Sequence, residues 1–262
     1  MLSAIVLAAA AFGVSLLTLY TGFGLGTLLL PAFALFFPLP VAVAATAVVH
    51  VLNNLFKVGL LGRHVETGVL LRFGIPAVLC SFAGAALLTA LAEQEPWHLE
   101  FLGRAWQVTP ISFWMGLLIA VFALVDLTPA ADRLRVHPRW LALGGMLSGF
   151  FGGLSGHQGA LRAAFLAPLG LAPPVYVATQ AVLACAVDFA RLSVYGISFL
   201  AGRMEGLSSA GEWALVAWAT PWAFAGAWVG ARRLPGATLR GVRALTGALL
   251  LAVGFGLMLG LV

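Results

Sequence analysis

The stretch GGLSGHQGALRAAF, from Gly152 to Phe165, breaks an otherwise apolar chain with glycines and three polar side chains, His157, Gln158 and Arg162. Arg162 stands alone between uncharged runs of 22 residues before it and 25 residues after it. Successive glycines interrupt a helix and free backbone N–H groups, which must face protein or a wet cavity because lipid cannot bond them. The stretch therefore predicts a discontinuous membrane segment that carries a polar site.

The rest of the chain has the composition of a membrane protein. Hydrophobic residues make up 62% of its 262 residues, and charged residues make up only 9%. Long uncharged runs occupy residues 1–56, 73–92, 105–125, 163–187, 213–231 and 244–262. Because about 20 apolar residues cross a hydrocarbon core as a helix, the sequence predicts an all-α polytopic membrane protein with about seven or eight membrane segments.

The charges of the loops predict an orientation. Basic residues exceed acidic ones in residues 57–72, 132–139 and 232–243, whereas acidic residues exceed basic ones in 93–104 and 203–212. The basic loops are expected on the cytoplasmic side, and this bias accounts for the net charge of +5 without any nucleic-acid partner. Six alternating crossings follow, near residues 41–61, 68–91, 107–127, 173–200, 212–231 and 241–262.

The location expected for the protein is a bacterial-type cytoplasmic (inner) membrane, in which it is multi-pass. The apolar N-terminal stretch lacks a basic flank and runs well beyond the length of a signal-peptide core. We therefore interpret it as a retained membrane segment.

The first part of the chain contains a second glycine-rich break, YTGFGLGTLLLPAF, from Tyr20 to Phe33. The two breaks correspond at one offset of 133 residues, which also pairs Ser15 with Ser148, Gly26 with Gly159, Pro40 with Pro173 and Thr46 with Thr179. The expected domains are a first repeat over residues 1–128, a cytoplasmic linker over 129–139 and a second, inverted repeat over 140–262. Inverted repeats with discontinuous helices are typical of secondary transporters. Whether residues 1–37 and 140–170 are re-entrant or crossing stays open.

Each break offers groups that suit an anion. A half-helix that begins after Gly24 or Gly159 would direct its free N–H groups and its positive dipole end toward a ligand. The alternative is that the glycines only allow close helix packing. The candidate contacts besides the three polar side chains of the second break are Gly24, Gly26, Thr27, Thr46, Asn54, Ser155, Gly156, Gly159 and Thr179.

Arg162 is the most specific of the candidates, because a guanidinium binds oxyanions through a fork of donors. The alternatives are that it reaches an interface or pairs with Asp188. Asp188 and Arg191, three residues apart on one helix, are expected to neutralise each other. His157 and Asp188 are candidates for proton coupling, although a neutral, hydrogen-bonded His157 is the plainer reading. Lys57 is expected to extend its ammonium to the membrane surface.

Other functional classes find little support. No Cys or His cluster has metal-ligand spacing and no Walker motif is present, so neither a metal site, a cofactor nor ATP-driven transport is expected. Cys80 and Cys185 lie in apolar segments and are interpreted as packing residues. The sequence GLSG around Ser155 resembles the rhomboid protease motif, but no His follows far enough along the chain to serve as its base. We therefore expect no enzyme.

The two copies carry a resemblance to a known family. In the first copy a glycine cluster, an apolar half-helix with Pro31, a Leu-Pro turn and the pair Ala45-Thr46 follow one another, and the second copy repeats the order with Ala164 in place of the half-helix proline. This pattern resembles the duplicated signature of the sulfite exporter TauE/SafE family. The resemblance implies export of sulfite or an organosulfonate, with proton coupling left open, by a protein whose partners are a small anion and the lipid bilayer. A homodimer is compatible with it, and an anion channel or a transporter of another small anion, such as a carboxylate or thiosulfate, is the alternative.

Overall fold

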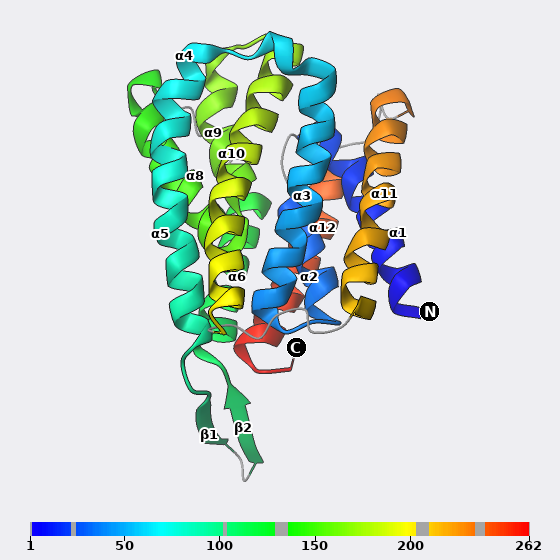
Figure 1. Ribbon diagram of the computed structural model, residues 1–262, viewed down its shortest axis with the longest axis vertical. Coiled ribbons are helices and arrows are strands. Elements are labelled where there is room, and N and C mark those ends of the chain that lie inside the picture. Colours follow the sequence, from blue (N-terminus) through cyan, green and yellow to red (C-terminus); the bar gives the residue numbers. More distant parts are fainter. Residues whose placement is uncertain are drawn as a thin grey trace.

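The computed structural model describes residues 2–21, 25–101, 104–128, 136–202, 210–233 and 239–261. It is a helical bundle, as the sequence predicts (Figure 1). The helices of the first half are α1 (Leu2–Thr21), α2 (Leu25–Ala34), α3 (Leu39–Leu61), η1 (Gly62–His64), α4 (Thr67–Val69), η2 (Leu70–Gly74), α5 (Ile75–Ala92) and α6 (Pro110–Leu127). The helices of the second half are η3 (Pro138–Trp140), α8 (Leu141–Ser155), α9 (Gln158–Leu166), η4 (Ala167–Leu169), α10 (Pro173–Leu200), α11 (Ala210–Arg233) and α12 (Leu239–Met258).

Three stretches of the described residues are long and apolar enough to cross a membrane: Leu39–His64, Thr67–Ala92 and Pro173–Leu200. They agree with three of the predicted crossings. Large apolar side chains on their outer faces are exposed, including Leu60, Leu79 and Ile197. Such exposure suits a lipid environment and would be unfavourable in water.

The two interrupted segments enter the bundle from opposite ends. In Figure 1, α1 starts at the lower end, α2 returns to that end, and α3 then rises through the bundle. The second segment does the reverse, because α8 and α9 lead back to the upper end and α10 then descends. Each interrupted segment is therefore a helical hairpin that returns to the end from which it started. The two hairpins thus start at opposite ends of the bundle. The inverted repeat itself stays a prediction.

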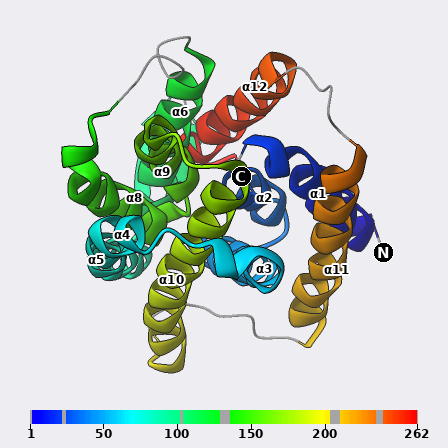
Figure 2. The same ribbon diagram turned by 90° about the horizontal axis from the view of Figure 1, so that it is seen from above.

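The two halves of the chain pack against each other through specific helix pairs. Helix α3 packs against α10, and α6 packs against α12, so each of these helices meets the helix that the predicted repeat would make its counterpart (Figure 2). The hairpin helix α1 instead packs against α11 of the second half, and α8 packs against α5 of the first half. Each half therefore supplies the surface that covers the hairpin of the other half.

A glycine ridge on α8 allows its close contact with α5. Gly145, Gly149 and Gly153 follow one another at intervals of four residues, and a Cβ atom on any of them would overlap the backbone of η2 or α5. The carbonyl groups it would meet are those of Phe73, Ala77 and Ser81. Small residues at this spacing let two membrane helices approach through their backbones. This ridge fixes the position of the break at the end of α8.

One element was not expected from the sequence. Strands β1 (Trp97–Phe101) and β2 (Arg104–Val108) form an antiparallel hairpin in which Trp97 pairs with Val108, and it extends from the lower end of the bundle (Figure 1). The sequence indicated only a loop over residues 93–104, and the crossing predicted near residues 107–127 is present as α6, which starts at Pro110. The expected cytoplasmic linker, residues 129–139, falls mostly outside the described residues.

Candidate functional site

The break between α8 and α9 is a sharp turn at Gly156. Gly156 has φ +82°, in the left-handed region that favours glycine, and its N–H caps α8 by donating to the carbonyl of Gly152 at 2.9 Å. The sequence predicted that the half-helix would begin after Gly159. In the structure, helix α9 starts earlier, at Gln158. Two further bonds hold the turn, from Ser148 Oγ to the Gln158 carbonyl at 2.9 Å and from the Tyr195 hydroxyl to the Gly153 carbonyl.

Gly156 also makes room for a buried arginine. Arg191 of α10 is fully buried, and a Cβ atom on Gly156 would lie 2.9 Å from its Nη1. The absence of a side chain at Gly156 thus serves both the turn and the guanidinium beside it. The sequence alone predicted for Gly156 only a contact to the anion.

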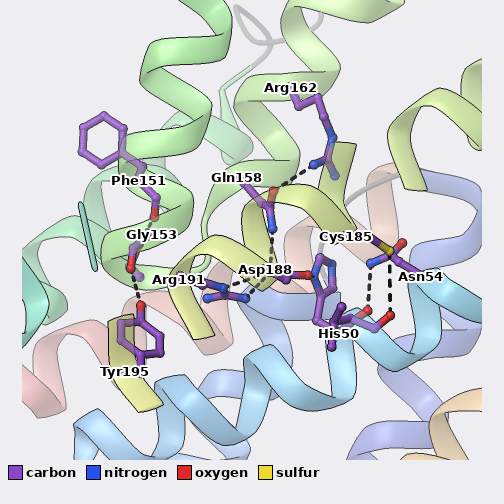
Figure 3. Close-up of polar contacts among 12 residues, drawn as sticks. His50, Asn54, Phe151, Gly153, Gln158, Arg162, Cys185, Asp188, Arg191 and Tyr195 are labelled. Carbon is purple, nitrogen blue, oxygen red and sulfur yellow. Dashed lines mark hydrogen bonds and ion pairs between the residues drawn. The ribbon is translucent and has the colours of Figure 1, made fainter. Parts of the chain in front are cut away.

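Asp188 of α10 is the centre of a buried polar cluster (Figure 3). Its Oδ2 lies 2.6 Å from Nδ1 of His50 on α3, and its Oδ1 accepts from Nε of Arg191 and Nε2 of Gln158, each at 2.9 Å. Nη2 of Arg191 lies 2.7 Å from the same Oδ1. The predicted pairing of Asp188 with Arg191 is confirmed, whereas His50 and its bond across 138 residues of sequence were missed.

Gln158 connects this cluster to Arg162. Its Oε1 accepts from Nη1 of Arg162 at 2.9 Å while its Nε2 donates to Asp188. The two neighbours fix the orientation of the amide, because a guanidinium can only donate and a carboxylate can only accept. The alternative in which Arg162 pairs directly with Asp188 is therefore wrong, since the amide of Gln158 lies between them.

The second partner of Arg162 is also a neutral amide. Nε of Arg162 donates to Oε1 of Gln180, and in the described part of the chain Nη2 has no hydrogen bond. Arg162 is 3% exposed, so it does not extend to an interface. The structure thus shows a buried guanidinium whose direct partners carry no charge.

The buried charges described in the helices do not cancel. Asp188 is matched by Arg191, which leaves the positive charge of Arg162 uncompensated. An uncompensated charge inside a protein is costly, and so is one within a membrane. The cluster therefore has the electrostatic character of a site for an anion.

Helix α3 contributes a polar stripe that sequence analysis did not recognise as a whole. Thr46, His50, Asn53 and Lys57 lie three or four residues apart and so share one face of the helix. Thr46 Oγ1 and both polar atoms of the Asn53 side chain are buried without hydrogen-bond partners among the described residues, and Nε2 of Gln180 is in the same condition. The spacing of these side chains was the signal that could have revealed the stripe.

His157 lies apart from the Asp188 cluster. Its ring stacks on Phe122 of α6 at 5.4 Å between ring centroids, and its Nδ1 lies 2.9 Å from Ser155 Oγ. Because Ser155 donates its own proton to the Phe151 carbonyl, Nδ1 of His157 must be the donor. In the neutral ring Nε2 is then an acceptor without a partner among the described residues. An acceptor has no hydrogen to donate to an anion, so neutral His157 does not favour anion binding.

The remaining candidates occupy varied positions. Thr179 accepts from the Glu66 N–H at 2.9 Å, and Asn54 donates to the His50 carbonyl at 2.9 Å. Thr46 and Thr179 lie within α3 and α10, about two turns after the helix starts at Leu39 and Pro173. Gly24 lies outside the described residues. Gly26 and Thr27 fall in the first turn of α2, and Gly159 follows the start of α9.

Comparison with known proteins gives one family. The family profile described as Sulfite exporter TauE/SafE matches residues 7–257, nearly the whole chain. No curated protein and no solved structure matches the chain significantly.

Proposed function

Because the chain belongs to the sulfite exporter TauE/SafE family, it is a multi-pass membrane transporter of sulfur anions and not an enzyme, and we propose that it exports sulfite or a small organosulfonate. The membrane in this proposal is the bacterial cytoplasmic membrane. The buried cluster around Arg162 holds the anion during transport.

One observation carries the proposal, namely the uncompensated charge of Arg162. Its partners Gln158 and Gln180 are neutral, and the only buried carboxylate that the structure describes, Asp188, is matched by Arg191. A sulfite or sulfonate group would supply the missing negative charge. Its oxygen atoms suit the donor fork of a guanidinium.

The neighbouring amides complete a shell for such a group. Nη2 of Arg162 and Nε2 of Gln180 are donors without partners in the described structure. An oxyanion that accepts from both would satisfy the buried amide of Gln180 and add a bond to the guanidinium, which favours binding. The membrane potential, negative inside, then favours outward movement by ~2.3 kcal/mol per charge for each 100 mV.

The binding test compares two arginines. The variants Arg162→Gln and Arg162→Lys should both weaken the binding of sulfite and methanesulfonate to purified protein, measured by calorimetry or thermal shift. Arg139→Gln is the matched control, because Arg139 is exposed and lies over the ring of Trp140, away from the cluster. Unchanged affinity in Arg162→Gln would remove Arg162 as the anion contact.

The transport test separates a transporter from a channel. Proteoliposomes preloaded with unlabelled sulfite should take up labelled sulfite faster than empty ones, and the flux should saturate. A linear flux with no acceleration by preloading would show a channel and contradict the proposal. A parallel series with sulfate, thiosulfate and small carboxylates would identify the preferred anion.

A further inference from the structure

The contact between His50 and Asp188 leads to a second proposal, which rests on the proposed function. We propose that binding of an anion at Arg162 is linked to the uptake of one proton by His50, and that Gln158 connects the two groups. The site is therefore pH-sensitive although its anion contact, Arg162, does not titrate.

The hydrogen bonds define where the proton binds. Oδ2 of Asp188 can only accept, so Nδ1 of His50 carries the hydrogen of their 2.6 Å bond and Nε2 of His50 keeps a free lone pair. Asp188 also accepts from Gln158 and Arg191, and these donors suit the ionised carboxylate. An added proton therefore goes to Nε2 of His50.

His50 is also the accessible member of the pair. Its side chain is 11% exposed, whereas that of Asp188 is fully buried. His50 is thus the less enclosed of the two groups. The neighbouring carboxylate then stabilises the imidazolium that forms.

The surrounding charges give the linkage its sign. The charged groups that act on His50 are Asp188 and Arg191 of α10 and Arg162 of α9. Without an anion, a proton on His50 would add a second uncompensated positive charge to the cluster. A bound anion cancels one of these charges, so it favours protonation, and protonation in turn favours the anion.

The helices packed around His50 contain few other titratable groups. Lys57 on α3 and Tyr176, Cys185 and Tyr195 on α10 complete the titratable groups of these two helices. Helix α2 and the middle of α11, residues 213–231, contain none, and α5 contributes only Cys80. Arg63 and His64 belong to η1, beyond the end of α3.

Gln158 is the positioning residue of the linkage. Its amide is the only hydrogen-bonded connection between Asp188 and Arg162 within the described chain. A change in the charge balance of the His50–Asp188 pair therefore alters the acceptor that holds Arg162. Replacement of Gln158 by Met keeps the approximate volume but removes both bonds.

The experiment measures methanesulfonate affinity between about pH 5 and pH 8, the range in which imidazole titrates. Methanesulfonate stays ionised throughout, so any pH dependence belongs to the protein. Wild-type affinity should strengthen as the pH falls, by at most about tenfold per pH unit, which is the limit for one linked proton. His50→Asn, whose amide can still donate to Asp188, should show a flat profile, and Gln158→Met should show weaker binding with a reduced slope.

His157→Asn is the matched control, because it also keeps a donor toward its partner, Ser155. It should retain the wild-type slope. An equal slope in His50→Asn, or a loss of slope only in His157→Asn, would overturn the proposal.

Proton uptake on mixing wild-type protein with methanesulfonate in weak buffer gives a readout that needs no variant. Uptake of no proton would also overturn the proposal. Binding that is present but independent of pH leaves the proposed function intact, whereas absence of sulfonate and sulfite binding at every pH would refute both.

Discussion

Nδ1 of His50 lies 2.6 Å from Oδ2 of Asp188, and this bond joins the first half of the chain to the second. His50 belongs to α3 and Asp188 to α10, the two helices that occupy equivalent positions in the two halves. Asp188 also fixes Arg191 and Gln158 through its other oxygen. The stability of the helix interface and the charge of the anion site therefore depend on the same carboxylate.

Removal of that carboxylate should destabilise the fold. Asp188→Asn leaves Arg191 buried without a counter-charge, and breaking a buried ion pair from one side costs about 3 to 5 kcal/mol. Thermal unfolding in detergent should show a clear fall in Tm. The double variant Asp188→Leu/Arg191→Met, which removes both charges, should recover most of the loss. A wild-type Tm for Asp188→Asn would contradict the importance of the pair.

Gly156→Ala should be more harmful than the same change at Gly170. Both glycines have positive φ, +82° and +63°, so each substitution introduces backbone strain of about 1 to 3 kcal/mol. Only at Gly156 would the new Cβ also meet Arg191, whereas nothing lies within 4 Å at Gly170. Unfolding midpoints and methanesulfonate affinity should both fall further for Gly156→Ala. Equal losses would show that the contact with Arg191 is unimportant.

Gly149→Ala should disturb the packing of α8 against α5. The added Cβ would overlap the Ala77 carbonyl. Over-packing usually lowers the free energy of unfolding by up to about 3 kcal/mol, and we expect a loss near that limit. Gly59→Ala is the control, because nothing lies within 4 Å of that position and alanine favours a helix by up to about 1 kcal/mol. Expression level and Tm should separate the two variants. Tolerance of alanine at Gly149 would show that the helices separate easily.

Lys57 should guide anions toward the cluster. It is half-buried, lies two turns beyond His50 on the same face of α3, and forms no ion pair within the described structure. Lys57→Gln should raise KM for sulfite about threefold with little change in kcat, because steering acts before the anion is seated. The effect should shrink at high salt. Arg63→Gln, which changes an exposed residue of η1, serves as the control. An equal KM in wild type and Lys57→Gln would leave the lysine only its expected interfacial role.

Much of the architecture follows from local patterns in the sequence. Apolar runs of spanning length give the bundle, and the glycines around Gly156 locate the break to within two residues of the start of α9. Arg162 could be identified because a charge in the middle of a long apolar run is costly and therefore informative. The i,i+3 spacing likewise sufficed for the pair Asp188 and Arg191.

The contacts that define the cluster could not be obtained in this way. His50 and Gln180 become partners of Asp188 and Arg162 only when α3, α9 and α10 pack together, and no local pattern encodes that packing. The β-hairpin is different, because its signal was present. Apolar and polar residues alternate from Trp97 to Phe101, which is the period of a strand.

The exchange of packing partners between the two halves has a consequence for how such a chain could arise. A polypeptide with only the first copy would expose the hairpin helix α1, because the helix that covers it, α11, belongs to the second half. Its helix α5 would also lack a partner, because α8 belongs to the second half. Two such polypeptides inserted in opposite orientations would satisfy each other, as α1 with α11 and α8 with α5 do within this chain. Fusion of the two copies would then have joined an antiparallel pair of polypeptides into one chain, and separately expressed segments 1–128 and 140–262 should still assemble with each other.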